Sequence, residues 1–455
     1  MNPMHLERPM KMSASRLFTV LTALCFLTGP LPSFAAPPAS GGTPAPSRLT
    51  ASERDAALSS IKEELQRTYV FPEKRAALVE RLERERKAGR YDVDSPAEFS
   101  ERVTADLKDA SKDRHLYLVN DAAQYAAAKA PKARETDTDA YWRQRALRDH
   151  HGLTELRVLP GNVRYLKLPA FHWVQDETGA AYDDALRFLK DGDAAIIDLR
   201  DNGGGSHAAV RYLVSHFLDG DVLLLTFQGG SKPPEQSRTL EHLPAGRLMG
   251  KPLYVLINSQ VGSAGEDFAY DVQQFKLGEL IGARTAGAAN NNSLVPVAPC
   301  FVLSVSHGRP VHAVSQTNWE GVGVAPDVET PPEQALQVAQ SRALKRLLAT
   351  PGLSPDLRFE YTWAQTTVEA VLHPVSVSQQ ALKPLAGRFG PHEVSWKDGA
   401  LWLRRGSRAP VRLTPLTTEG LFSVEGYEVL RARLTGKSLE LLWSDDPAPA
   451  VFARG

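Results

Sequence analysis

Apolar residues recur at helical spacing in the first part of the chain. They return every four positions over residues 61–69 and lie along one side of the charged segment 76–87. Residues 95–98, Ser-Pro-Ala-Glu, form a capping box with proline at the first helical position, which predicts a third helix through Ala110. Together these segments predict a small helical domain over residues 51–150.

After this domain the pattern changes to short apolar runs, each followed by a turn and a helix. Residues 194–199 (Ala-Ala-Ile-Ile-Asp-Leu) and 253–257 (Leu-Tyr-Val-Leu-Ile) are two such runs, typical of strands buried on both faces. The alternation predicts an α/β domain with a largely parallel sheet over residues 155–350. Beyond it, β-like composition and the turn at residues 397–399 (Lys-Asp-Gly) predict a small antiparallel β domain over residues 365–455.

The N-terminus has the pattern of a targeting segment. A positively charged flank precedes the apolar run 17–27, and Ser33-Phe34-Ala35 has small residues at the two positions that a signal peptidase recognises. The run is too short to predict a membrane span. We therefore predict a signal peptide over residues 1–35, a Pro/Ala/Gly/Ser-rich linker over 36–50, and export to the periplasm or the medium, with no integral membrane span after cleavage.

Composition and charge limit the partners and cofactors. Fifty-three basic residues balance 53 acidic ones, so the net charge of +0 does not indicate nucleic acid as a partner. Of the two cysteines, Cys25 leaves with the signal peptide, so Cys300 has no intramolecular partner and a thiolate-rich metal site is excluded. No local motif has metal-ligand spacing, and we predict no metal and no cofactor.

Ser263 is the first candidate for chemistry. It follows the apolar run 253–257 and a turn, and it opens a helix, so its hydroxyl lies at the C-terminal edge of the predicted sheet, where α/β folds place ligands. Unpaired N–H groups at the helix start suit the stabilisation of an oxyanion. Residues 263–266 (Ser-Ala-Gly-Glu) also fit a capping box, and from this segment alone the serine is more often only a cap.

A run of three glycines, residues 203–205, forms the turn after the first buried strand. Glycines there let backbone N–H groups approach a ligand, although a glycine run on its own is also typical of a simple tight turn. His207 comes just after this turn, and we interpret it as a histidine on the helix surface rather than in a cleft.

Read together, four ordered blocks between residues 160 and 330 resemble the tail-specific, or C-terminal processing, serine peptidases. The blocks are residues 198–205 (DLRDNGGG), 262–270 (GSAGEDFAY), 280–287 (LIGARTAG) and 319–327 (WEGVGVAPD). The helical front, ending in Lys-Asp-Arg-His-Leu at 112–116, is similar to the branch that contains interphotoreceptor retinoid-binding protein and the tricorn core protease. The resemblance implies a crotonase- or ClpP-like spiral of β-β-α units.

The resemblance also assigns roles around the nucleophile. It implies that Ser263 is the nucleophile, and that Gly203 or Gly204, together with the N–H of Ala264, forms the oxyanion hole. In the branch with a lysine base, that lysine lies 25 residues after the serine, where this chain has Ala288. Arg284 is nearby, but arginine stays protonated and cannot accept a proton. A serine–lysine mechanism is therefore not expected.

For the other branch, the resemblance implies a histidine base and a distant glutamate, which His115 and Glu320 match. A histidine suits the task, because its pKa lies near working pH. The tricorn-type pattern has a serine directly before the histidine, whereas this chain has Arg114. We therefore predict a supporting ion pair between Arg114 and Glu320 that positions the segment carrying His115.

The resulting expectation is an exported serine endopeptidase that acts on peptide or protein substrates through an acyl-enzyme. A non-catalytic binding protein for apolar small molecules or peptides, on the same fold, is the alternative. An esterase-like hydrolase with the same residues is a third reading. Ser263, the glycine turn, His115 and Glu320 together favour the enzyme, because a binding protein has no need of all four.

Overall fold

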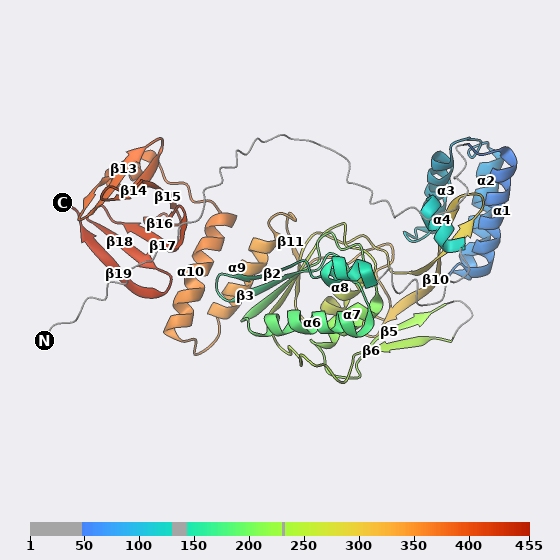
Figure 1. Cartoon of the computed structure of the whole chain (residues 1–455), viewed down its shortest axis with the longest axis horizontal. Coiled ribbons are helices and arrows are strands. Elements are labelled where there is room, and N and C mark those ends of the chain that lie inside the picture. The colour runs from blue at the N-terminus through green and yellow to red at the C-terminus, as the bar shows by residue number, and fades with distance from the viewer. Residues whose placement is uncertain (1–47, 130–142, 230–232) are drawn as a thin grey trace. The chain divides into compact units, whose positions relative to one another are not determined.

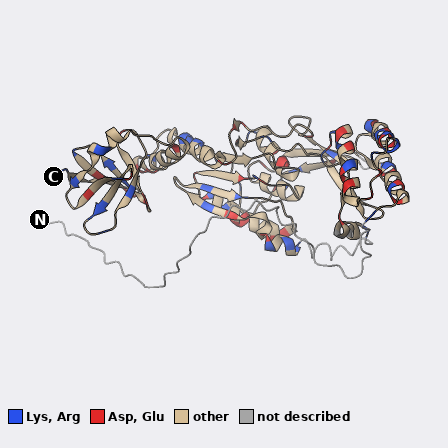
Figure 2. Cartoon of the chain, turned by 90° about the horizontal axis from the view of Figure 1, so that it is seen from above, with Lys and Arg blue, Asp and Glu red and all other residues tan. Residues whose placement is uncertain are grey.

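The computed structural model describes residues 48–129, 143–229 and 233–455 (Figure 1). The predicted signal peptide and most of the predicted linker lie outside the described residues. Among the described residues, no helix is both long and apolar enough to cross a membrane. In Figure 2, basic and acidic residues are interspersed on the N-terminal helices, as the balanced composition suggests.

The front of the chain is helical, as predicted, but later strands complete its core. Its elements are α1 (Ala51–Thr68), α2 (Pro72–Lys87), α3 (Pro96–Ser111), β1 (Tyr117–Asn120) and α4 (Ala122–Lys129). Ser95 caps α3 at the predicted position, since its side chain accepts a hydrogen bond from the Glu98 N–H. Leu58 and Phe99 pack in one apolar cluster with Phe301 and Leu303. The front helices therefore rest on strand β10 (Phe301–His312).

A six-stranded sheet lies at the centre of the α/β region. Its strands, in spatial order, are β11 (Val328–Glu329), β8 (Glu279–Gly282), β7 (Leu253–Ile257), β4 (Ala194–Asp198), β3 (Val163–Lys167) and β2 (Glu155–Leu159). All neighbouring pairs are parallel except β2 with β3. This confirms the predicted parallel sheet.

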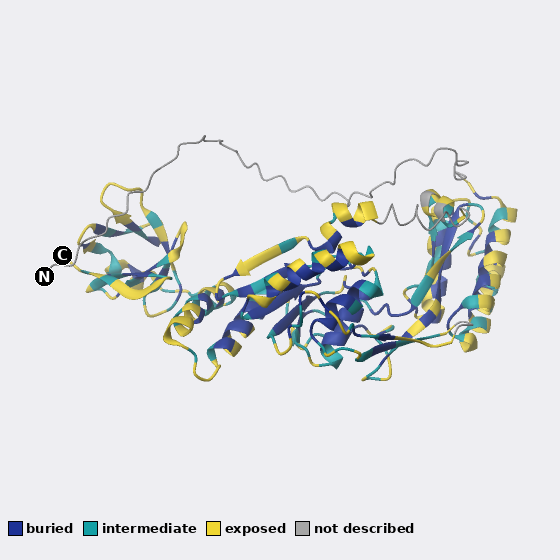
Figure 3. Ribbon diagram, turned by 60° about the horizontal axis from the view of Figure 1, so that its bottom comes forward, coloured by how far each residue is buried: buried dark blue, intermediate teal, exposed yellow. Residues whose placement is uncertain are grey.

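Helices cover both faces of this sheet, which explains the continuous apolar runs. Ala195 and Ile197 of β4 face the core formed with α6 (Gln175–Lys190), α7 (His207–Ser215) and α8 (Ala264–Gln274). Ala194 and Ile196 alternate with them and face the core formed with α9 (Ala335–Leu348) and α10 (Pro355–Leu372). Successive side chains of one strand thus enter opposite cores. Figure 3 shows the central strands buried along their length.

A second sheet joins the front of the chain to the α/β region. Its order is β1-β10-β5-β6, with β9 also paired to β10, where β5 is Leu223–Gln228, β6 is Glu235–Arg238 and β9 is Asn291–Val297. The antiparallel pairing of β1 with β10 sets Tyr117 opposite Ser304. Because His115 lies two residues before Tyr117, this pairing fixes the place of the predicted base.

The C-terminal part is an antiparallel β domain. Its eight strands pair in sequence order: β12 (Gly387–Phe389), β13 (His392–Lys397), β14 (Ala400–Arg405), β15 (Val411–Pro415), β16 (Leu421–Val424), β17 (Tyr427–Leu434), β18 (Ser438–Trp443) and β19 (Asp446–Ala453). A bridge between Phe389 and Arg454 links the first strand to the chain end. The predicted boundary at residue 365 falls inside α10, because Tyr361 and Val368 of that helix are buried against the α/β core.

Candidate active site

Ser263 is the N-cap of helix α8, and its backbone has a conformation that capping does not require. Its φ and ψ are 51° and −122°. The serines that cap α3, α7 and α10, which are Ser95, Ser206 and Ser354, all have ordinary extended backbone with negative φ. Positive φ in a non-glycine residue costs about 1–3 kcal/mol and concentrates at functional sites. The contrast distinguishes Ser263 from the other helix-capping serines of this chain.

The carboxylate of Glu266 fixes this strained turn. It is fully buried, and one of its oxygens accepts hydrogen bonds from the Ser263 N–H at 3.1 Å and the Ala288 N–H at 2.7 Å. The other accepts from the Thr285 hydroxyl and the Gly287 N–H, each at 2.6 Å. Burial raises the pKa of Glu266, while these four donors act in the opposite direction. Ala288, where the other branch has its lysine, therefore contributes a backbone donor to the turn.

The glycine loop packs directly against the serine. A Cβ on Gly204, whose φ is +113°, would lie 2.7 Å from the Ser263 Cβ, so no larger residue fits there. The Gly204 N–H donates to the side-chain oxygen of Asn202 at 2.8 Å and is thus used within the loop. Gly203, in contrast, has open space where a Cβ would stand. Of the two glycines expected at the oxyanion hole, only Gly203 remains a candidate donor, together with Ala264, the first residue of α8.

A cavity of about 230 Å³ borders Ser263 and Ala264. The apolar part of its wall comes from Leu225, Phe227, Ala289, Pro310 and Trp319. The polar part includes His207, Asp267 and the asparagine run 290–292. A mixed wall of this kind, beside a hydroxyl at a helix N-terminus, suits a peptide side chain or another small apolar group.

His115 and Glu320 come together in a second group, with Asp113 as an additional member. One nitrogen or oxygen atom from each of the three residues lies within 4.8 Å of the others. Glu320 accepts hydrogen bonds from the backbone N–H groups of Ala289 at 2.6 Å and Asn290 at 2.8 Å. Sequence reasoning missed Asp113, because its place beside Glu320 depends on a contact more than 200 residues away in the sequence.

Burial sets the electrostatics of this group. It lowers the pKa of His115, against the attraction of the Asp113 charge, which favours the neutral imidazole that a base requires. Burial and the nearby Asp113 charge raise the pKa of Glu320 to about 7. The Glu320 carboxyl group therefore ionises near neutral pH.

Asn290 connects this group to the serine cavity. Its side-chain amide donates to Asp113 at 3.3 Å, its N–H donates to Glu320, and the residue also lines the cavity. His115 and Glu320 are not among the residues that border the cavity. The structure thus forms two groups. His115 and Glu320 belong to one, and Ser263, Ala264 and Gly204 belong to the other. Asn290 contacts the first group and lines the cavity of the second.

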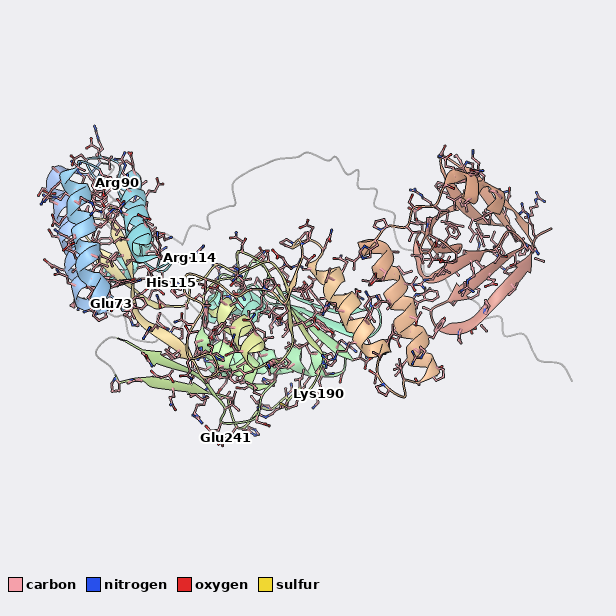
Figure 4. All side chains as sticks on the ribbon, turned by 180° about the vertical axis from the view of Figure 1, so that it is seen from behind. Glu73, Arg90, Arg114, His115, Lys190 and Glu241 are labelled. Atoms are coloured by element: carbon pink, nitrogen blue, oxygen red, sulfur yellow. The ribbon has the colours of Figure 1, made fainter. Side chains whose placement is uncertain are left out.

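The predicted ion pair between Arg114 and Glu320 is wrong. Arg114 is exposed, and no ion pair between the two side chains is found in the described part of the chain. Instead, a hydrogen bond from the Arg114 backbone helps to lower the pKa of Glu320. Figure 4 shows Arg114 beside His115 at the end of the front segment. The side chains at 113 and 115 are the ones directed toward the carboxylate, so the intervening arginine projects elsewhere.

His207 also differs from its predicted place on a helix surface. It lines the cavity and hydrogen-bonds through Nδ1 to Asp267 at 2.6 Å and through Nε2 to the Ser237 hydroxyl at 2.7 Å. Although burial opposes it, the charge of Asp267 raises the pKa of His207. His207 and Asp267 each lie near the N-terminus of a helix that follows a strand of the parallel sheet. Because these helices start at the same edge of the sheet, the sequence pattern could have indicated that the two side chains meet.

Family models match two segments of the chain. Residues 162–330 match peptidase family S41. Residues 50–146 match the N-terminal domain of this peptidase family in eukaryotic IRBP. The first segment holds Ser263, the glycine loop and Glu320, and the second holds His115.

Curated relatives are similar over part of their length. The chloroplastic C-terminal processing peptidase of Tetradesmus obliquus is 27% identical over 172 residues, 37% of this chain and 35% of the relative. The tail-specific protease of Haemophilus influenzae is 31% identical over 30% of this chain and 19% of its own length. The tricorn protease of Thermoplasma volcanium is 33% identical over 30% of this chain and 13% of its own length. The chain therefore spans about a third or less of each of these relatives.

Solved structures overlap with more of the chain at lower identity. A photosystem II D1 C-terminal processing protease aligns with a TM-score of 0.43 and 15% identity, over 66% of this chain and 98% of its own. A tricorn protease structure aligns with a TM-score of 0.41 and 13% identity, over 63% of this chain and 35% of its own.

Proposed function

Because the chain carries the domain of peptidase family S41, we propose that it is an exported serine endopeptidase that cleaves peptide bonds through an acyl-enzyme on Ser263. The observation that carries the proposal is the backbone of Ser263, strained at φ 51° beside a cavity. The order β2–β3–α6 supports the finer expectation of a spiral of β-β-α units.

In the proposed mechanism, the Ser263 hydroxyl attacks the carbonyl carbon of a substrate that occupies the adjoining cavity. His115 accepts the hydroxyl proton and later transfers it to the leaving amine, so that a water molecule can then hydrolyse the acyl-enzyme. The N–H groups of Ala264 and Gly203 stabilise the tetrahedral oxyanion, since Ala264 begins a helix and has no intrahelical acceptor. Glu320 orients the imidazole and stabilises its charged form.

Local hydrogen bonds support the placement of the nucleophile and of the segment that carries the base. Glu266 anchors the Ser263 backbone through the hydrogen bond to its N–H, so the nucleophile keeps one orientation. The Ser304 hydroxyl donates to the His115 carbonyl at 2.5 Å and holds the segment that carries the base. Asn290 joins the two groups. Transfer of the Ser263 proton requires the imidazole to reach the serine when substrate is bound, because catalytic hydrogen bonds often tighten only in the complex.

Labelling with a fluorophosphonate probe, which reacts with activated serines, tests the proposal. The wild-type protein should label at Ser263 and cleave unstructured peptides, and Ser263→Ala should abolish both. Ser206→Ala, at the start of the neighbouring helix α7, is the matched control and should keep labelling. If the wild-type protein does not label but binds peptides or apolar ligands, it is the binding protein considered as the alternative.

A further inference from the structure

Asp113, His115 and Glu320 form a compact set of metal-ligating side chains. One atom of each lies within 4.8 Å of the others. Asp113 is 2% exposed, and the other two are partly buried. Hydrogen bonds hold all three in place, because Asp113 accepts one from the His115 N–H at 2.9 Å and Glu320 accepts two from backbone N–H groups.

Several atoms of this group are buried without a hydrogen-bond partner. They are Nδ1 of His115, Oε1 of Glu320 and Oδ1 of Asn290. Asn290 is only 2% exposed, and its amide nitrogen and backbone N–H contact Asp113 and Glu320, so the residue packs against two members of the group. Buried polar atoms without partners are uncommon in native proteins and call for an explanation. The two oxygens offer lone pairs, and Nδ1 of His115 offers one in the tautomer that carries its proton on Nε2.

The charges point to a cation. Asp113 and Glu320 are two carboxyl groups close together in a poorly solvated site, since Asp113 is buried and Glu320 is partly buried. A divalent cation between them removes the repulsion between their charges. An imidazole nitrogen beside carboxylate oxygens favours Zn²⁺, whereas Mg²⁺ and Ca²⁺ prefer oxygen ligands alone.

We propose that Asp113, His115 and Glu320 form a zinc site that inhibits the enzyme. Zinc bound at Nδ1 of His115 leaves the ring proton on Nε2, so the imidazole can no longer accept the proton of Ser263. Tetrahedral zinc sets its ligand atoms about 3.4 Å apart, so the three side chains move together slightly, and Asn290 Oδ1 or water fills the fourth position. The proposal of zinc binding does not depend on the proposed function, whereas the proposal of inhibition rests on it.

Calorimetric titration of Zn²⁺ into the full-length Ser263→Ala protein tests zinc binding without relying on peptidase activity. We expect one zinc per chain with a micromolar or tighter Kd, and no measurable binding of Mg²⁺ or Ca²⁺. Asp113→Asn should weaken zinc binding tenfold or more. Asp267→Asn is the matched control, since that carboxylate is also buried beside a histidine but lies in the other group, and its zinc affinity should be unchanged.

A second measurement keeps all three proposed ligands and therefore serves if Asp113→Asn does not fold. Co²⁺ substituted into the Ser263→Ala protein should give a hyperfine-shifted imidazole N–H resonance in its proton NMR spectrum. Absence of zinc binding, equal zinc affinity in Asp113→Asn, or a Co²⁺ form without that resonance overturns the site.

Inhibition is measured separately on the wild-type protein. Zinc should block fluorophosphonate labelling of Ser263 over the same concentration range in which it binds, and EDTA should restore labelling. Zinc binding with unchanged labelling overturns the inhibition. Absence of labelling even in EDTA overturns the proposed function and the inhibition with it, and leaves the result of the zinc titration standing.

Discussion

At the scale of single residues, the chain distinguishes one serine from its other helix-capping serines. An N-cap serine needs only extended backbone and a side-chain oxygen near the first N–H groups. Ser263 instead has φ 51°, a value that glycine adopts at no steric cost. The carboxylate of Glu266 holds the turn in this form, because it accepts hydrogen bonds from the Ser263 N–H and from the Ala288 N–H of a neighbouring loop. The strain is therefore built into the site, as expected where position matters more than stability.

Substitution by glycine measures this strain. Ser263→Gly should be more stable than Ser263→Ala by about 1 kcal/mol, because glycine relieves the positive φ, and both variants should be inactive. At Ser95, an ordinary N-cap with φ −76°, glycine relieves no strain and keeps only the preference over alanine common to N-caps, so the stability gap between the two variants should be smaller than at position 263. Urea denaturation of the four variants checks this, and a gap between glycine and alanine at position 263 no larger than the gap at position 95 would contradict the strain.

The pKa of Glu320 sets a pH dependence. This pKa is raised to about 7, so the carboxylate that orients His115 forms only as the pH rises through that value. We expect kcat/KM to increase with pH through an inflection near 7. In Glu320→Gln the inflection near 7 should disappear, leaving a limb below pH 6.5 from His115, whose pKa burial lowers, and kcat should fall by up to about 10⁴-fold. An inflection near 7 that survives in Glu320→Gln would exclude this role.

At the scale of elements, the site depends on two strand–turn–helix units that meet at one sheet edge. Strands β4 and β7 are adjacent and parallel, so the glycine loop after β4 lies against the turn that begins α8. The sequence predicted both units, because their strands are apolar throughout and their turns are rich in glycine. It did not distinguish Gly203 from Gly204, since local sequence does not show which Cβ position faces Ser263.

The two glycines should respond differently to alanine. Gly204→Ala places a Cβ 2.7 Å from the Ser263 Cβ at φ +113°, so we expect a loss of roughly 1–3 kcal/mol in stability and loss of probe labelling. Gly203→Ala adds a Cβ in open space and should change stability by less than about 1 kcal/mol. Thermal unfolding and labelling of both variants check this, and a well-folded, fully labelled Gly204→Ala would show that the loop adapts.

At the scale of the whole molecule, the candidate site joins segments that lie far apart in the sequence. Local periodicity predicted the parallel sheet, the helical front and the C-terminal strands, because each depends on residues a few positions apart. It could not place Asp113 beside Glu320, or His207 beside Asp267, since these contacts form only when β1 pairs with β10 and α7 packs near α8. The wrong Arg114 ion pair has the same origin, because side-chain direction at 113–115 is set by that long-range pairing.

Strand β10 therefore offers a test of how the front segment positions the base. Ser304 and Ser306 are both fully buried on this strand, two residues apart. The Ser304 hydroxyl donates to the His115 carbonyl and accepts from the Asn292 amide at 2.7 Å, whereas the Ser306 hydroxyl has no partner. Ser304→Ala should cost about 1–3 kcal/mol of stability and lower kcat, because the segment that carries the base loses its hydrogen bond. KM should change as well, since Asn292 of the cavity wall loses its acceptor.

Ser306→Ala removes a hydroxyl that is already unpaired, so it should be neutral or slightly stabilising and leave kcat unchanged. The comparison separates positioning of His115 from general damage to the strand, since both variants delete the same atom from the same element. Steady-state kinetics and urea denaturation of the two proteins supply the measurements. Equal losses of kcat in both variants would mean that β10 acts only as a structural support, and that the Ser304 hydrogen bond does not position the base.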